Sequence, residues 1–142
     1  MTQLTMTRPA GAATRTMLAP LCGMAVYLLA GAMTQPYDAG DWQFGLIASG
    51  VLVVVAATVA YAAVRRSHPR TISIAALSLA VLGLATTPFL FWLGIPEVFG
   101  ATAIGLALEV RSSQHRWTVA SLAAVVVGLV ALCLGAVGLW VW

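Results

Sequence analysis

Few side chains in this sequence are of a type that does chemistry, and the most suggestive is Glu97. It lies within residues 71–110, forty largely apolar residues that contain no Arg or Lys. A carboxylate inside a membrane is costly and usually functional, as a proton or ion site. At a helix start near the membrane surface, the carboxylate would only interact favourably with the positive end of the helix dipole. We expect this second role, and keep Glu97 as the candidate functional carboxylate.

The other polar candidates lie in segments between apolar runs. Asp38 and Asp41 belong to a polar turn, where we expect solvated carboxylates. His68 and His115 lie in two separate basic segments, and nothing in their spacing brings the two imidazoles together. The sequence therefore predicts no metal site and no cofactor.

The two cysteines, Cys22 and Cys133, both lie inside apolar runs and form no Cys-x-x-Cys pair. A free cysteine in such a setting behaves as a small hydrophobic side chain, and we expect both to be buried. Nucleophilic catalysis needs a base and an orienting group near the nucleophile. Ser67 beside His68 is only an adjacency, so we predict no catalytic residue and a non-enzymatic protein.

Composition defines the solvent in which these residues act. The chain is 61% hydrophobic and 8% charged, whereas a soluble domain is about one quarter charged. Such a chain cannot cover itself with a water-facing surface, which indicates a membrane protein. All seven cationic residues are Arg, and they lie in short segments between apolar runs, so they indicate topology rather than nucleic-acid binding.

The apolar runs predict an all-α, polytopic transmembrane helix bundle with five spans. Residues 1–15 form a short polar tail, and residues 16–142 a single membrane domain. The predicted spans are about 16–33, 44–64, 71–93, 96–110 and 117–141. An alternative for the first run is a cleaved signal peptide, since Arg8 and Arg15 precede it and Ala30–Ala32 near its end are small.

The stretch 71–110 must fold back, because as one helix it would be about 60 Å long, twice the bilayer core. We place the break at residues 94–97, where Pro96 suits an opening helical turn. The alternative break at Pro88 would draw Glu97 into the hydrocarbon. With the preferred break, aromatic residues gather at the membrane interface: Phe89, Phe91, Trp92 and Phe99.

Charge segregation gives the orientation. With five spans, all Arg residues fall on one side of the membrane: Arg8, Arg15, Arg65, Arg66, Arg70, Arg111 and Arg116. Short Arg-rich loops remain cytoplasmic, so the N-terminus is predicted to lie in the cytoplasm and the C-terminus outside. The expected location is the bacterial cytoplasmic membrane.

Small residues recur along the last span at alternating spacings of three and four. They are Ser121, Ala124, Gly128, Ala131, Gly135 and Gly138. Helices in lipid associate where small residues allow close approach, so we expect this seam to be a helix contact. The contact is either within the chain or with a partner.

Residues 71–138 resemble a widespread small bacterial membrane domain of unknown function. The resemblance rests on an Ala/Leu-rich span, an aromatic turn with Pro, a Gly-rich returning span ending in Arg, and a further Ala-rich span: residues 75–84, 91–96, 100–107, 111–116 and 120–131. It implies no activity and no site residues.

Two functions follow from these patterns. The first is a small multi-pass inner-membrane protein that acts through helix or loop contacts with a membrane partner or a second copy, with the lipid bilayer around it and no nucleic acid. The alternative is a small transporter or ion-pathway subunit that uses Glu97.

Overall fold

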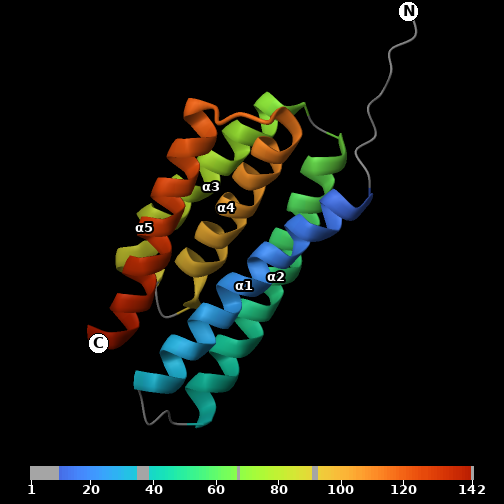
Figure 1. Cartoon of the computed structure of the whole chain (residues 1–142). Coiled ribbons are helices and arrows are strands. Elements are labelled where there is room, and N and C mark those ends of the chain that lie inside the picture. Colours follow the sequence, from blue (N-terminus) through green and yellow to red (C-terminus); the bar gives the residue numbers. More distant parts are fainter. Residues whose placement is uncertain (1–9, 35–38, 67, 91–92, 142) are drawn as a thin grey trace, which may run out of the picture.

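The described residues of the computed structural model, 10–34, 39–66, 68–90 and 93–141, form five α-helices and no strand. These are α1 (Ala10–Thr34), α2 (Ala39–Arg66), α3 (Pro69–Leu90), α4 (Ile95–Gln114) and α5 (Val119–Val141). Successive helices run in opposite directions (Figure 1). Since the described residues form only helices, the all-α prediction is confirmed. The shortest, α4, has 20 residues and is therefore about 30 Å long, roughly the thickness of the bilayer core.

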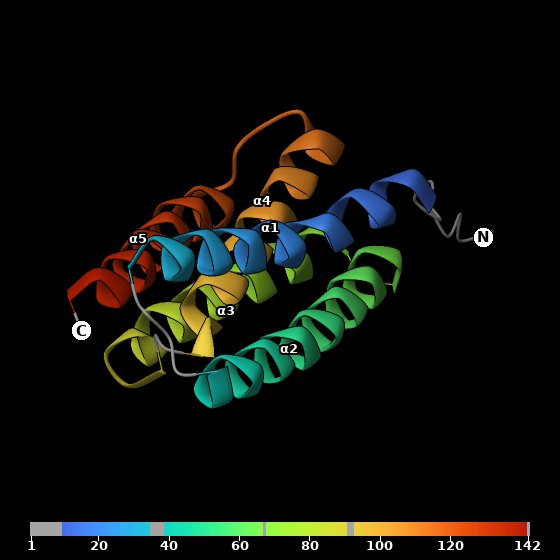
Figure 2. The same cartoon turned by 90° about the horizontal axis from the view of Figure 1, so that it is seen from below.

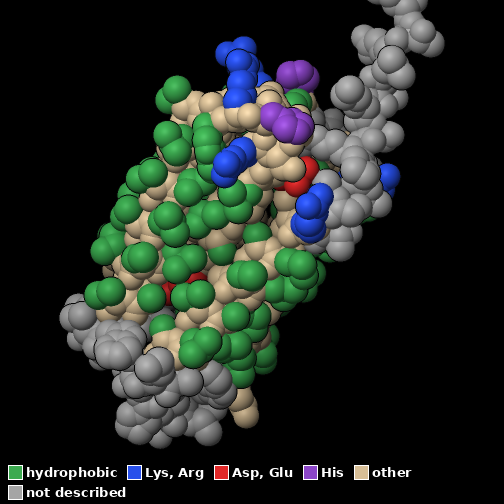
Figure 3. Space-filling view, in the orientation of Figure 1, with side chains coloured by type: hydrophobic (Ala, Val, Ile, Leu, Met, Phe, Trp, Pro, Cys, Tyr) green, Lys and Arg blue, Asp and Glu red, His purple; other side chains and the backbone are tan. Residues whose placement is uncertain are grey.

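Three helices of the described chain are long and apolar enough to cross a membrane. They are the segment Leu46–Arg65 within α2, all of α3, and Val119–Gly138 within α5. In α1 the described apolar segment is the shorter Arg15–Ala30. Hydrophobic side chains cover the body of the bundle, whereas basic and histidine side chains gather at one end (Figure 3).

The helix α4 lies at the centre of the bundle. It packs against α1, α3 and α5 and more lightly against α2, and the view from below shows it passing behind α1, next to α3 (Figure 2). More than half of its residues are buried. Because protein rather than lipid surrounds α4, this helix tolerates two Glu residues that an isolated membrane span would not.

The chain turns back between α3 and α4, at the predicted break. Gly94 precedes α4 with a φ of 71°, a left-handed conformation that glycine adopts without strain, and Pro96 lies in the opening turn. Pro88 lies inside α3 near its end, so the alternative break is not observed. Phe89 is 76% exposed, whereas Phe91 and Trp92 lie outside the described residues.

Candidate functional site

Glu97 lies in the first turn of α4, as expected, but not at a surface. Its side chain is 0% exposed, because neighbouring helices bury it. The expected position at a helix start is observed, and its depth in a membrane stays a prediction. Neither carboxylate oxygen has a hydrogen-bond partner among the described residues. A glutamate at this helix position often bonds back to the N-cap amide, yet the cap of α4 has no side-chain hydrogen bond. Glu97 is thus a buried carboxyl whose oxygens have no hydrogen-bond partner among the described residues.

Glycines on the neighbouring helices make room for Glu97. A Cβ placed on Gly135 of α5 would lie 2.6 Å from Oε1 and 3.1 Å from Oε2 of Glu97. A Cβ on Gly23 of α1 would overlap the backbone of Glu97 and would lie 2.8 Å from the Cα of Val98. At Gly23 only a residue without a side chain fits, and at Gly135 a Cβ would displace the carboxyl group, so α1 and α5 enclose the carboxyl and its backbone from two sides.

The turn before α4 is also closed. A Cβ on Gly94 would lie 2.9 Å from Cγ of Tyr27, a buried residue of α1. The Tyr27 ring therefore covers the turn from which α4 starts. Because the ring lies against the backbone of Gly94, it separates this part of α4 from the surface of the bundle.

The helices α4 and α5 also approach each other closely one turn further along. A Cβ on Gly100 would lie 2.6 Å from the carbonyl oxygen of Gly128, and a Cβ on Gly128 would lie 2.9 Å from that of Gly100. The two backbones touch directly at this crossing. It holds α5 close enough for Gly135 to contact Glu97.

The small-residue seam of α5 faces the interior of the bundle. Ser121, Ala124, Gly128, Ala131 and Gly135 are buried, and Gly138 is half-buried. A Cβ on Gly83 of α3 would lie 3.5 Å from Cβ of Ala131. The seam thus contacts α3 and α4 of its own chain.

Glu109 is a second buried carboxylate that the sequence interpretation overlooked. It lies near the other end of α4 and is 8% exposed. It lines a cavity of about 410 Å³ between α1 and α4, together with Arg15, Cys22 and Ser112. The signal in the sequence was a second acidic residue twelve positions after Glu97 in the same apolar run.

His68 and His115 each lie at the end of a helix. Nδ1 of His68 accepts a hydrogen bond from the backbone N–H of Arg70 at 3.4 Å, at the start of α3. His115 ends α4 in a left-handed conformation with φ 55°, and its N–H donates to the carbonyl of Arg111 at 2.8 Å. Within the described part of the chain, no three His, Cys, Asp or Glu residues are grouped as a metal site.

The expectation of buried cysteines is wrong. Cys22 and Cys133 are both free and exposed, on the outer faces of α1 and α5. The runs around them are apolar on every side of the helix, so their sequence position did not reveal the side they face. Asp38 and the side chain of Asp41 lie outside the described residues.

No protein-family model, curated protein or solved structure matches this chain. The resemblance of residues 71–138 to a bacterial membrane domain stays a prediction. Function is therefore argued from the site alone.

Proposed function

We propose that this chain is a non-enzymatic, five-span protein of the bacterial cytoplasmic membrane in which Glu97 carries protons as part of an ion pathway. The observation that carries the proposal is the complete burial of Glu97 without a hydrogen-bond partner among the described residues. An uncompensated buried carboxylate costs several kcal/mol in its charged form, and much less when it is neutral. Carboxyl groups that are buried in a membrane protein at such a cost usually take up and release protons as part of a pathway.

A proton suits the site better than a metal cation. Among the described residues, no side chain donates to or coordinates the two carboxylate oxygens of Glu97, and glycines of α1 and α5 lie against it. A bound Ca²⁺ takes six to eight oxygen ligands and Mg²⁺ six, whereas a proton needs only the carboxyl itself. The proposed cargo is therefore H⁺.

The membrane topology is part of the proposal. Three helices meet the requirements of a span on their own, and α1 and α4 pack alongside them in the same bundle. The N-terminus of α1, both ends of the α2–α3 connection and the α4–α5 connection share one end of the bundle, where the basic side chains gather (Figures 1 and 3). This arrangement supports a cytoplasmic basic end, an outward turn before Glu97 and an external C-terminus.

The partner-contact function loses its main support. Gly128 and Gly135 face α4 of the same chain, so they are not available to a second protein. A function through contacts with a partner would have to use another surface of the bundle.

The test is proton flux in liposomes. The purified protein is reconstituted with a pH-sensitive dye inside, and an imposed pH gradient is followed for wild type, Glu97→Gln and Glu109→Gln. We expect Glu97→Gln, which cannot ionise, to abolish flux. Glu109→Gln is the matched control. It removes the second buried carboxylate of α4, which lies near the opposite, basic end of the helix from Glu97. This variant should retain most of the flux.

Flux that is absent in wild type, or equal in wild type and Glu97→Gln, would refute the proposed function. Orientation is checked separately with single cysteines at positions 38, 68 and 113 after removal of the native ones. Labelling by a membrane-impermeant maleimide from outside is expected at 38 alone, and labelling at 68 or 113 would overturn the topology.

A further inference from the structure

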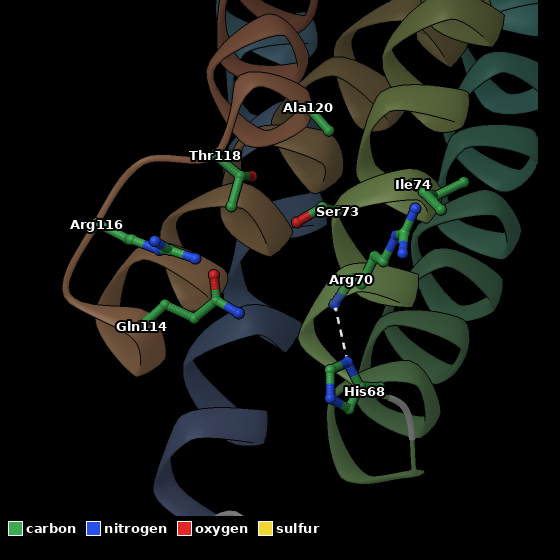
Figure 4. A pocket seen from close by; sticks show the side chains of 8 residues that line it. All are labelled: His68, Arg70, Ser73, Ile74, Gln114, Arg116, Thr118 and Ala120. Carbon is green, nitrogen blue, oxygen red and sulfur yellow. Dashed lines mark hydrogen bonds between the residues drawn. The ribbon is translucent and has the colours of Figure 1, made fainter.

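A pocket of about 520 Å³ opens at the basic end of the bundle, away from Glu97. It lies between the start of α3 and the α4–α5 connection (Figure 4). This volume lies within the range of small-molecule sites, about 300–1,000 Å³. Its polar lining consists of His68, Arg70, Ser73, Gln114, Arg116 and Thr118.

The charge of this pocket is entirely positive. Two arginines line it from opposite walls, Arg70 from α3 and Arg116 from the α4–α5 connection, and both are exposed. No Asp or Glu is among its lining residues. In Figure 4, Arg116 and Gln114 point from their side toward Ser73, while Arg70 extends along α3 beside Ile74. An anion is the ligand that this charge favours.

Helix ends add donors to the positive side chains. Both α3 and α5 begin at this pocket, and the amide end of a helix favours anions. At α5, Thr118 and Ser121 cap each other: Oγ of Ser121 accepts from the Thr118 N–H at 3.0 Å, and Oγ1 of Thr118 accepts from the Ser121 N–H at 3.1 Å. Thr118 and Ala120 of this helix start both line the pocket.

A side-chain oxygen without a hydrogen-bond partner among the described residues belongs to Gln114, which lines the same pocket. Oε1 of Gln114 is buried and has no hydrogen-bond partner among the residues that the structure describes. A side-chain amide presents either an acceptor or an NH₂ donor, depending on its rotation by 180°. The NH₂ group of Gln114 is the donor that this side chain can offer to an anion in the pocket.

The apolar part of the lining extends the pocket toward the side of the bundle. Ile74 and Ala120 form this part, and the side chain of Ile74 is more than half exposed. A lipid presents the same combination, with a charged phosphate above an apolar chain. In the proposed topology this end faces the cytoplasmic leaflet, which is rich in anionic lipid.

From these features we infer that the pocket binds a phosphate group, supplied by the headgroup of an anionic lipid or by free phosphate. Arg116 binds its oxygens, Arg70 adds positive charge from the start of α3, the start of α5 and Gln114 add neutral donors, and Ile74 contacts the chain of a lipid. This site is independent of Glu97 and of the proposed proton pathway.

The test measures binding by native mass spectrometry and by thermal stabilisation of the purified protein in mild detergent. The probes are phosphatidylglycerol, phosphatidylcholine and inorganic phosphate. The variant is Arg116→Gln, and the matched control is Arg65→Gln, which removes the same charge from α2, where Arg65 donates to the Tyr61 hydroxyl at 3.0 Å. We expect Arg116→Gln to weaken phosphatidylglycerol binding about tenfold, the worth of one charge-assisted hydrogen bond, and Arg65→Gln to leave it unchanged.

The probes also separate the two sources of phosphate. Binding of phosphatidylglycerol that inorganic phosphate does not displace supports the lipid headgroup, and saturable binding of inorganic phosphate that is lost in Arg116→Gln supports free phosphate. Equal weakening by Arg65→Gln and Arg116→Gln would reveal a diffuse surface charge and overturn the site. Failure of both phosphate probes to bind wild type, or equal binding of phosphatidylcholine, would also overturn it.

Discussion

Substitution of Gly128 by alanine tests the helix crossing that encloses Glu97. The new Cβ would lie 2.9 Å from the carbonyl oxygen of Gly100 and 3.1 Å from Cγ1 of Ile104. Ordinary contact begins at 3.4 Å, so α4 and α5 must separate by about half an ångström. Backbone atoms cannot rotate away as a side chain does, and overpacking of this kind costs about 1–3 kcal/mol.

The matched control is Gly50→Ala on α2, where nothing lies within 4 Å of the added Cβ. Both substitutions gain about 1 kcal/mol from the higher helix propensity of alanine, so the gain cancels in the comparison. At about 2–4 °C per kcal/mol for a chain of this size, Gly128→Ala should melt about 2–12 °C below Gly50→Ala. The measurement is thermal unfolding in mild detergent at one scan rate, with monodispersity checked by gel filtration.

A double substitution sharpens this test. Gly100→Ala places its Cβ 2.6 Å from the carbonyl oxygen of Gly128, in the same contact. Separation of the helices for one alanine makes room for part of the other, so the combined loss should be smaller than the sum of the two single losses. If Gly128→Ala melts at or above Gly50→Ala, or if the two losses simply add, the proposed close contact between α4 and α5 is wrong.

Three further predictions follow from the same contacts. Glu97→Met should melt at or above wild type and lack proton flux, because removing an unpartnered buried polar group recovers about 1–3 kcal/mol; a fall of several degrees would mean that the carboxyl makes a needed contact. Gly23→Ala should melt below Gly50→Ala, since its Cβ meets the backbone of Glu97 and Val98, and an unchanged midpoint would contradict the packing of α1 on α4. Cys133 should resist a water-soluble maleimide in intact membranes and react once the protein is unfolded in detergent, because lipid around the exposed face of α5 excludes the reagent; prompt labelling in membranes would contradict its lipid-facing position.

Local features predicted the helices and the turn between α3 and α4 well. Pro96 lacks an amide N–H and suits the first turn of a helix, and Gly94 supplies the left-handed conformation before it. These effects depend only on neighbouring residues. The fourth helix runs one turn beyond its predicted end at Val110, to Gln114, because the polar residues there still continue the helix outside the bundle core.

The surroundings of Glu97 were not predictable in the same way. Its sequence position is the same whether α4 faces water, lipid or other helices. Gly23 of α1 and Gly135 of α5 lie against it, and these residues are far from Glu97 in sequence. The exposed Cys133 has the same cause, since a helix that is apolar on all faces does not reveal which face lies inward.

The sequence by itself determined that this chain is a helical membrane protein, where its central turn lies, and that its arginines alternate with apolar runs. Composition and short-range geometry are sufficient for these features. Only the tertiary structure decided that α4 is the central helix, that Glu97 is enclosed without a partner, and that Arg70 and Arg116 line one pocket. The reason is physical: these properties arise from contacts between helices, and small residues permit such contacts without specifying which helix makes them.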